Sequence, residues 1–290
     1  MPNEVGPSVV EGLGWGLEVD ETKLAGAASG AGVYRVRLDG RDAVLKVTAG
    51  AGQQNGRREL AFYRTLAERV PVATPQLLRY ADNDEFTAIV LSAHTPAPPA
   101  HEWDQAAWLE VGRQLAALHS MSPPDEQRWT ETTWLREVLR QPPVTLADNY
   151  WSTTTAAGAV DQLLSETTAL ARDVDAVPDC FLHGDCHADN LLRDGDNLIV
   201  WADWQSTGVG APAGELALLW SRAHADGADL PYDAMLHEYA DLRRIDAAKL
   251  RAAVRAAELA LLLFAWPGFA RNLPQSKQDR LTSRLLQLTD

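Results

Sequence analysis

The feature that most constrains this chain is a run of polar residues placed around one short β-hairpin in its second half. The run is HGDCHADN, from His183 to Asn190, and Asp203 follows thirteen residues after Asn190 in the segment WADW. Between them, Asp194-Gly195-Asp196 has the turn chemistry of a hairpin that joins residues 190–192 to residues 198–201. Such a hairpin places Asn190 and Asp203 at the same end of the ribbon, near the loop that bears Asp185.

These residue types suit phosphoryl transfer. Transfer from ATP needs a carboxylate that accepts the proton of an acceptor hydroxyl, and oxygen ligands that hold Mg²⁺ against the phosphates. Asp185 can supply the base, and Asn190 and Asp203 can supply the ligands. Two other interpretations are a hairpin merely capped by carboxylates and a zinc site formed by the two histidines and the cysteine of the run. The zinc site is disfavoured because the chain has no second Cys or His pair at zinc-like spacing.

The run resembles the catalytic H-G-D-x-H-x-x-N motif of the aminoglycoside phosphotransferase family, which comprises small-molecule kinases with a protein-kinase-like fold. Every motif position is matched. The resemblance implies an α+β, bilobal protein-kinase-like fold, with a small β-rich N-terminal lobe and a larger, mostly helical C-terminal lobe. It further implies that Asp185 is the catalytic base and that Asn190 and Asp203 bind the metal ion. His183 and His187 would then orient the catalytic loop rather than act on the substrate.

The first 90 residues contain elements that suit a nucleotide-binding lobe. Residues 33–38 and 43–47 are expected to form a hairpin, and residues 86–93 a buried strand. Residues 57–69 are expected to form a helix that Pro71 and Pro75 end. Lys46 lies inside an apolar strand, where a lone lysine is costly unless it is paired or lies against phosphate. Glu59, on the expected helix, is its natural partner, although nearby arginines compete for it. By the resemblance, Lys46 binds phosphate and Glu59 is its ion-pair partner.

Two further segments are assigned to nucleotide binding. The loop before Lys46 contains Ser29, Gly30 and Gly32, whose backbone N–H groups can lie over phosphates. This signal is weak, because small residues also suit an ordinary tight hairpin and no Walker A sequence is present. By resemblance alone, the strand ending near residue 93 leads into a hinge, where backbone groups of Ser92, Ala93 or His94 can hydrogen-bond a purine.

A proline-rich segment, TPAPPA at Thr95–Ala100, is the best linker in the chain. It divides an N-terminal nucleotide-binding lobe, residues 1–94, from a C-terminal catalytic and acceptor-binding lobe, residues 95–290. After the linker the pattern is helical, and Asp104 is expected to cap the first helix. Further helices are expected at residues 134–139, 157–171, 214–224, 246–264 and 275–288. The most apolar run, Leu259–Trp266, is far shorter than the roughly 20 residues that cross a bilayer, so a buried helix is expected there.

The chain departs from the family pattern after the metal-binding aspartate. The family usually has G-D-P-x-x-D-L-A, whereas this chain has Gly210-Ala211-Pro212-Ala213-Gly214-Glu215-Leu216-Ala217. In the family the second acid ties the start of a helix to the catalytic loop, and Glu215 is expected to do so with a shifted geometry. Ala211 removes a contact that the first aspartate can make. The family's substrate preferences are therefore not transferred to this chain.

The distribution of charge favours a cationic acceptor. Residues 141–240 contain 16 acidic residues and three arginines, a net charge of −13, whereas the other 190 residues contain 24 acids and 23 bases. Such a segment repels nucleic acid and attracts a small cation, or else it is ordinary solvated surface. Trp129, Trp134 and Trp151 lie in polar surroundings and are candidates for stacking on the acceptor. The expected acceptor is an antibiotic, either an aminoglycoside or a basic cyclic peptide, with an aminosugar or amino alcohol as the alternative.

Other features concern compartment and class. The two cysteines, Cys180 and Cys186, are close together and do not suggest a disulfide framework, and no secretory signal is visible. We therefore expect a cytoplasmic protein without a membrane or nucleic-acid partner, as a monomer or a dimer. Two interpretations from other classes stay open at this point. One is a metal-dependent hydrolase built on His183, Asp185 and His187, and the other is a non-catalytic nucleotide-binding module.

Overall fold

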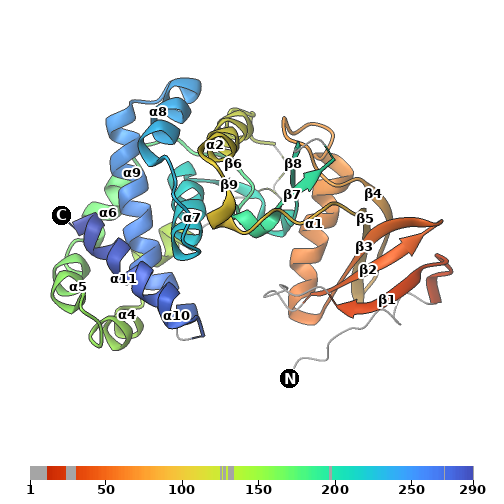
Figure 1. Ribbon diagram of the computed structural model, residues 1–290, viewed down its shortest axis with the longest axis horizontal. Coiled ribbons are helices and arrows are strands. Elements are labelled where there is room, and N and C mark those ends of the chain that lie inside the picture. Colours follow the sequence, from red (N-terminus) through yellow and green to blue (C-terminus); the bar gives the residue numbers. More distant parts are fainter. Residues whose placement is uncertain are drawn as a thin grey trace. The chain divides into compact units, whose positions relative to one another are not determined.

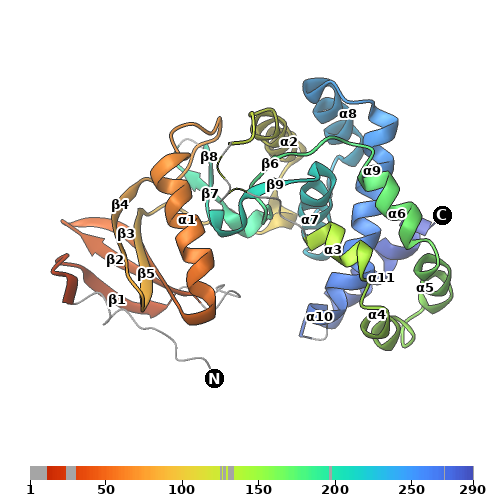
Figure 2. The same cartoon turned by 180° about the vertical axis from the view of Figure 1, so that it is seen from behind.

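The computed structural model describes residues 12–23, 31–124, 126, 129, 134–195, 198–270 and 272–289. A β-sheet region comes first in the chain and a helical part follows it, as the predicted α+β kinase-like fold requires (Figures 1 and 2). The chain forms two compact units. The sheet unit is the chain up to Pro96 together with Leu192–Thr207, and the helical unit is Ala97–Leu191 together with the chain from Gly208 onward. The sequence-based boundary at residue 94 stays a prediction.

The sheet unit contains a five-stranded antiparallel sheet. The predicted hairpin is present, because β2 and β3 pair with Val33 opposite Lys46 and Tyr34 opposite Leu45. The strand order is β1-β2-β3-β5-β4. The strands are β1 (Glu18–Lys23), β2 (Gly32–Leu38), β3 (Arg41–Ala49), β4 (Leu77–Asp82) and β5 (Phe86–Ser92). The two outer strands, β1 and β4, were not anticipated from the sequence.

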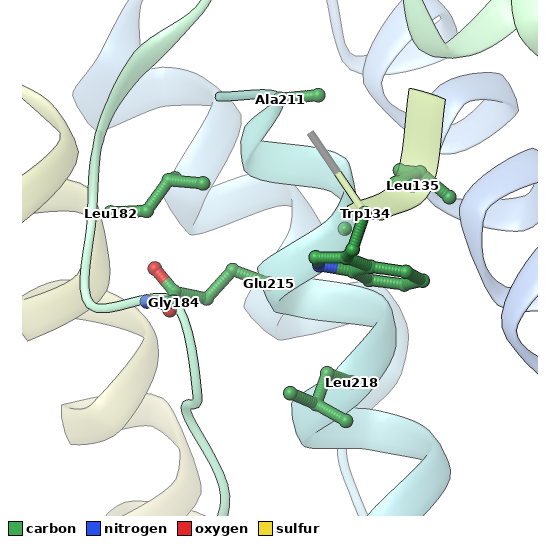
Figure 3. A pocket seen from close by; sticks show the side chains of 8 residues that line it. Trp134, Leu135, Leu182, Gly184, Ala211, Glu215 and Leu218 are labelled. Carbon is green, nitrogen blue, oxygen red and sulfur yellow. Dashed lines mark hydrogen bonds between the residues drawn. The ribbon is translucent and has the colours of Figure 1, made fainter. Parts of the chain in front are cut away.

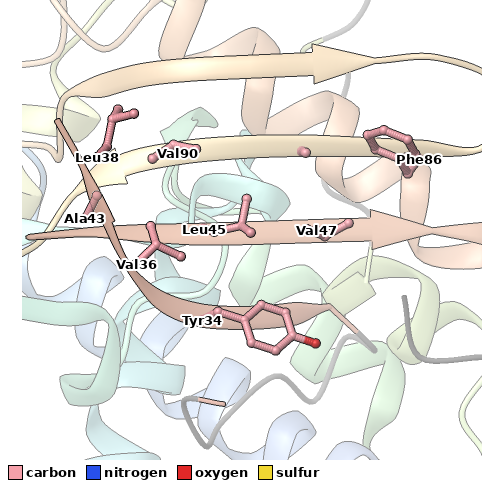
Figure 4. Close-up of a cluster of buried hydrophobic side chains, with 9 residues drawn as sticks. Tyr34, Val36, Leu38, Ala43, Leu45, Val47, Phe86 and Val90 are labelled. Atoms are coloured by element: carbon pink, nitrogen blue, oxygen red, sulfur yellow. The ribbon is translucent and has the colours of Figure 1, made fainter. Parts of the chain in front are cut away.

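The sheet places Lys46 on the face opposite its hydrophobic core. Leu45 and Val47 of β3 point into a cluster of buried side chains on one face of the sheet (Figure 4). Successive side chains of a strand point to opposite faces, so Lys46 points the other way. Helix α1 (Gln53–Thr65) packs against β3 and β5. Glu59 of this helix is therefore on the side of the sheet to which Lys46 points.

Helix α1 begins and ends four residues before the boundaries predicted from the sequence, residues 57 and 69. It starts directly after a short 3-10 turn, Gly50–Gly52. It ends where the backbone leaves helical geometry at Leu66, five residues before Pro71. The prediction that Pro71 and Pro75 end this helix is therefore wrong.

Gly56 allows α1 to approach β3 closely. A Cβ atom on Gly56 would lie 1.8 Å from Oγ1 and 3.0 Å from Cβ of Thr48. We expect Gly56→Ala to lower the free energy of unfolding by about 1–3 kcal/mol, although alanine is the better helix former. Thr48→Ala in the same chain removes the closest atom and should recover part of the loss. Urea denaturation measures both effects.

A matched control for this prediction is Gly158→Ala in helix α5 (Ala157–Leu164). Nothing lies within 4 Å of the position that its Cβ would occupy. Gly158→Ala should therefore stabilise the protein by up to about 1 kcal/mol through helix propensity alone. If both glycine substitutions had the same effect, the close contact between Gly56 and Thr48 would be wrong.

The hairpin predicted around Asp194-Gly195-Asp196 is present, although Asp196 lies outside the described residues. Strands β7 (Leu191–Asp194) and β8 (Leu198–Trp201) form a two-stranded sheet. Backbone hydrogen bonds attach this hairpin to the rest of the sheet unit: Arg193 pairs with Thr95, and the Trp201 N–H donates to Ala73. Asn190 directly precedes β7 but belongs to the helical unit. Its predicted approach to Asp203 therefore stays a prediction.

The helical unit contains a further short sheet, formed by β6 (Cys180–Leu182) and β9 (Gly208–Gly210). Asp104 caps the first helix as predicted, because its Oδ1 accepts the Ala107 N–H at 2.7 Å. The helices are α2 (Gln105–His119), α3 (Trp134–Arg140), α4 (Val144–Trp151), α5 (Ala157–Leu164), α6 (Thr167–Val174), α7 (Pro212–Ala225), α8 (Tyr232–Arg243), α9 (Ala247–Ala260), α10 (Trp266–Ala270) and α11 (Gln275–Thr289). Helices α4 and α8 were not anticipated.

The prediction of a single helix at residues 157–171 is wrong, because the helix is interrupted between α5 and α6. The Ser165 hydroxyl donates to the Gln162 carbonyl at 2.6 Å, and the Ser165 N–H bonds the same carbonyl. Such local bonds compete with the helical pattern.

The apolar stretch near the C-terminus is a core helix. Helix α9 continues through a π-helical turn, Leu261–Ala265, into α10. Residues 247–270 are long and apolar enough to cross a membrane, but 72% of the most apolar window is buried inside the protein. This agrees with the buried helix predicted for Leu259–Trp266.

Candidate active site

In the sheet unit, one lysine lies between two carboxylates. Lys46 Nζ donates to Asp203 Oδ1 at 2.5 Å and lies 2.7 Å from Glu59 Oε2. Lys46 and Glu59 are almost completely buried, whereas 31% of the Asp203 side chain is exposed. The chain therefore brings together three of the residues singled out from its sequence.

The buried charges of this triad hold Lys46 in its cationic form. Burial lowers the pKa of Lys46, but the Glu59 and Asp203 carboxylates outweigh it, so the pKa is raised overall. Burial raises the pKa of Glu59 to about 7, although Lys46 pulls it down. One buried ammonium thus compensates two acids. Of these two, Asp203 is the one that solvent or a ligand reaches.

Asp203 sits in an unusual backbone conformation. Its φ is 65°, in the left-handed region that non-glycine residues seldom adopt. The next residue, Trp204, is fully buried and stacks on Phe62 of α1, with ring centroids 3.9 Å apart. The indole Nε1 of Trp204 donates to the Trp201 carbonyl at 2.8 Å, and the Arg58 guanidinium donates to the Thr207 carbonyl. The segment after β8 is therefore fixed on α1, the helix that carries Glu59.

In the helical unit, the loop after β6 folds back on itself around Asp185. The Asn190 side-chain amide donates to the Asp185 carbonyl at 2.8 Å, and His183 Nδ1 accepts the Asp185 N–H at 3.3 Å. Gly184 has a φ of 90°, which L side chains rarely adopt, so this position of the loop favours glycine. The Asp185 carboxylate stays one-third exposed while its backbone is held from two sides. The Asp185 carboxylate is therefore accessible, while the backbone that carries it is held.

His187 lies between two carboxylates of the same loop. Its Nε2 is 3.6 Å from Asp185 Oδ1, and its Nδ1 is 3.6 Å from Asp189 Oδ2. Burial and the nearby Arg222 lower the pKa of His187. Arg222 also binds Asp189 at 3.0 Å. A neutral imidazole in this position lies between the two acids; the role of His187 in orienting the loop stays a prediction.

Glu215, in the first turn of α7, ties this helix to the loop. Its Oε1 accepts the Gly184 N–H at 2.6 Å, and its Oε2 accepts the His183 N–H at 3.1 Å. Oε2 also lies 2.8 Å from His119 Nε2. Burial on its own raises the pKa of Glu215, but the hydrogen bonds from His119 and the loop outweigh it and the pKa is lowered. The longer acid thus makes the contact that was expected with a shifted geometry. Ala211, directly before α7, has no side-chain oxygen that can cap the helix.

Sequence reasoning did not find His119. It is the last residue of α2 and is buried, with its ring between Glu215 and Tyr239. A signal was present, because His119 follows Leu115 by four residues and continues the buried stripe of α2. A histidine on such a stripe must find polar partners inside the protein.

A small hollow lies next to the loop that bears Asp185. Figure 3 shows the Glu215 side chain reaching from α7 toward Gly184, with the Trp134 indole on the other side of the hollow. The volume open to water-sized groups is about 10 Å³, room for roughly one water molecule. Trp134 is partly exposed here, so it stays a candidate for contact with an acceptor.

The prediction that the other two tryptophans contact an acceptor is wrong. Trp129 and Trp151 are almost fully buried, so neither ring is accessible to an acceptor. Trp129 packs edge-on against Phe181 of β6, and Trp151 packs against Tyr150. Both rings fill the core of the helical unit despite their polar sequence neighbours.

The remaining nucleotide-binding candidates are partly outside the described residues. Ser29 and Gly30 lie there, whereas Gly32 begins β2 opposite Val47. At the predicted hinge, the Ser92 N–H donates to the Gln76 carbonyl at 2.9 Å, so it is not free for a purine. The Ser92 hydroxyl lies 2.9 Å from His94 Nε2. Ala93 and His94 stay as the predicted hinge contacts.

Cys186 is poorly suited to bind zinc. Cys186 is fully buried, and burial raises the pKa of its thiol well above the usual value, whereas zinc binds the deprotonated sulfur. Among the residues that the structure describes, no group of three or more His, Cys, Asp or Glu side chains is arranged to hold a metal ion.

The acidic segment is less uniformly negative than its sequence indicates. Five of its acids form ion pairs with basic residues that lie outside residues 141–240. The net charge of the segment does not include these bases. The pairs are Asp175 and Asp179 with Arg136, Asp226 with Lys277, Asp233 with Arg251, and Glu238 with Arg113.

Comparison with known proteins shows a family and a fold. The model of the phosphotransferase enzyme family, APH, matches residues 21–274. No curated protein matches the sequence. Among solved structures, a microcompartment-associated aminopropanol kinase is 15% identical, with 97% of this chain and 94% of that chain covered and a TM-score of 0.68.

Two aminoglycoside phosphotransferases are also similar. A thermostable mutant of APH(4)-Ia, in a ternary complex with AMP-PNP and hygromycin B, is 17% identical, covers 99% of this chain and 98% of its own, and has a TM-score of 0.63. APH(3'')-Id from Streptomyces rimosus ATCC10970, in complex with ADP and streptomycin, is 19% identical, covers 81% and 94%, and has a TM-score of 0.53. At these identities the likeness shows the fold alone.

Proposed function

The chain belongs to the phosphotransferase enzyme family, whose model matches residues 21–274, and we propose that it transfers the γ-phosphate of ATP, with Mg²⁺, to a hydroxyl of a small cationic molecule. It is a small-molecule kinase with an alcohol group as acceptor, and complexes of its structural neighbours with ADP or AMP-PNP support the use of ATP. The observation that carries the proposal is the fixed catalytic loop around Asp185, together with the Lys46 triad. The metal ion, the cationic nature of the acceptor, the roles of the site residues and a cytoplasmic location all belong to this proposal.

The described residues fit a nucleotide with its metal ion. Asn190 uses its amide nitrogen on the Asp185 carbonyl, which leaves its oxygen for a cation, and Asp203 binds Lys46 through only one of its two oxygens. Lys46 has three N–H donors and directs two of them at Glu59 and Asp203, so one donor remains for a phosphate oxygen. Bound Mg²⁺ would neutralise phosphate charge.

Asp185 is the proposed base. Its carboxylate would accept the proton of the acceptor hydroxyl as that oxygen attacks the phosphorus. The loop holds Asp185 through its neighbours, so its own oxygens stay available. Catalysis in this scheme is mostly positioning and charge neutralisation.

The acceptor is proposed to be an amine-bearing alcohol. Asp189 supports this, because its side chain is 69% exposed in the loop that bears Asp185. Among the structural neighbours are complexes with hygromycin B and streptomycin as well as an aminopropanol kinase. We rank an aminoglycoside or basic cyclic peptide antibiotic first, with an aminosugar or amino alcohol as the alternative; the first would make the protein a resistance enzyme.

A coupled ADP-release assay tests the function. Aminoglycosides, basic cyclic peptides, aminosugars and amino alcohols form the arms of the panel, with neutral polyols as controls. Thermal shift with ATP plus Mg²⁺, and separately with Zn²⁺, distinguishes the other classes. Stabilisation by Zn²⁺ but not by ATP would favour a metal-dependent hydrolase, and stabilisation by ATP without turnover of any acceptor would favour a non-catalytic nucleotide-binding module.

Asp189→Asn should weaken binding of a cationic acceptor. Loss of this charge removes an attraction and also leaves the Arg222 cation without its partner. We expect KM for the acceptor to rise about five-fold at low salt, which corresponds to roughly 1 kcal/mol, and less at high salt, with kcat nearly unchanged. Asp161→Asn, an exposed acid on α5, is the matched control. Equal KM values for both variants would contradict a role of Asp189 in acceptor binding.

A further inference from the structure

A buried histidine is linked to the catalytic loop through Glu215. His119 is the last residue of α2 and is 1% exposed. Its Nε2 lies 2.8 Å from Glu215 Oε2, and its Nδ1 lies 2.6 Å from the Tyr239 hydroxyl of α8. The Arg243 guanidinium also donates to the His119 carbonyl. Both the ring and the backbone of this residue are therefore fixed.

The protonation of this network follows from its chemistry. Hydrogen bonds hold the pKa of Glu215 low, so its carboxylate is ionised and accepts only. His119 Nε2 must then carry a hydrogen and donate it to Glu215. Burial raises the pKa of Tyr239, so its phenol stays protonated and satisfies His119 Nδ1. The Glu215 carboxylate thus has three N–H donors: His119 Nε2 and the backbone of His183 and Gly184.

Loss of one of these donors affects the other two. A buried carboxylate is tolerated only when hydrogen bonds compensate its charge. Without His119, Oε2 keeps one donor, and the carboxylate must take up a proton, admit water or move. Each of these weakens its hold on the His183 and Gly184 N–H groups. Asp185 is the next residue in the chain, and a displacement of about 1 Å in an active site costs about 10²-fold in rate.

We infer that His119 is a positioning residue for catalysis: it anchors the Glu215 carboxylate, with Tyr239 behind it, so that Glu215 holds the backbone of the catalytic loop and thereby the Asp185 carboxylate. Coupling runs from the end of α2 and from α8, through the first turn of α7, to the loop after β6. The link to catalysis rests on the proposed role of Asp185, whereas the link to loop geometry does not.

Two variants of matched size separate donation from packing. His119→Gln keeps an N–H donor near the position of Nε2, and His119→Met fills a similar volume without one. We expect His119→Met to lower kcat at least ten-fold with KM for ATP within two-fold of the wild type. His119→Gln should stay within three-fold of wild-type kcat. Tyr239→Phe, which removes only the hydroxyl, should fall between these two.

Hydrogen exchange measures the same effect without turnover. The amides of His183 and Gly184 should exchange faster in His119→Met than in the wild type and in His119→Gln. Met235→Ala is the control for stability, because Met235 of α8 packs next to Gly112 of α2 and has no part in the hydrogen-bond network. It should lower Tm and leave both kcat and this local exchange unchanged.

The outcomes are distinguishable. Equal kcat and equal exchange for the Gln and Met variants would overturn the inference, as would a fall in kcat for Met235→Ala as large as that for His119→Met. If the wild type turned over no acceptor, the proposed function would fail, and the exchange data alone would still decide whether His119 holds the loop. In an active enzyme, the double variant Glu215→Gln/His119→Met should lower kcat by no more than the more damaging of the two single variants. Both changes break the same hydrogen-bond network.

Discussion

Asp185→Asn is expected to lower kcat by about 10²- to 10⁴-fold, the usual contribution of a positioned acid–base group. Asparagine keeps the size of the side chain, and the backbone contacts to His183 and Asn190 do not depend on the carboxylate. The fold and the Lys46 triad of the sheet unit should therefore persist. ATP binding, measured by thermal shift with Mg²⁺, should remain close to that of the wild type while ADP release falls.

The control for lost charge is Asp189→Asn in the same loop. It removes one negative charge from the neighbourhood of His187 but leaves the proposed base in place. A variant at Asp185 that retained more than about a tenth of wild-type kcat would show that the base assignment is wrong. A fall of similar size for both variants would attribute the effect to local electrostatics rather than to proton transfer.

The hairpin between Asn190 and Asp203 was predictable because its turn chemistry and flanking apolar residues agree with each other. The same holds for β2 and β3, whose period-two pattern determines which side chains share a face. That pattern also explains why Lys46 lies opposite the core and next to Glu59. Local signals of this kind are sufficient where a strand is long and half-buried.

Other elements carry no such signal. Strand β1, with the sequence EVDETK, has four charged residues out of six and no alternating apolar pattern, and it pairs with β2. Helix α1 begins and ends four residues earlier than predicted, because helix propensity does not determine where the backbone leaves helical geometry, here at Leu66. Trp129 and Trp151 show the same limit: polar sequence neighbours say little about whether a large ring fills the core.

Some residues of the candidate site could likewise be found from the sequence, and others could not. The residues of the H-G-D-x-H-x-x-N motif were found because their spacing in one loop is itself the signal. His119 is 96 residues from Glu215 and 120 from Tyr239, so only the fold brings the three together. Glu215 lies between these cases, since the family pattern marks its position but not the donors that keep its carboxylate ionised.

Asp203→Asn is expected to abolish Mg²⁺-dependent binding of ATP. Asparagine tolerates the left-handed backbone at this position at least as well as aspartate, so the segment after β8 should keep its conformation. The change removes one of the two negative charges on Lys46 and the anionic ligand proposed for the metal. We expect the affinity for ATP in the presence of Mg²⁺ to fall by roughly 10²-fold, which corresponds to about 2.7 kcal/mol.

Isothermal titration of ATP with and without Mg²⁺ measures this effect. In the wild type the metal should strengthen binding, and in Asp203→Asn the two titrations should coincide. Glu59→Gln is the matched control, because it weakens the other carboxylate on Lys46 without touching the proposed ligand. It should lower kcat through a misplaced Lys46 and retain the response to Mg²⁺. A metal response that survived in Asp203→Asn but vanished in Glu59→Gln would reverse the two assignments, because the buried acid rather than the exposed one would then govern the cation.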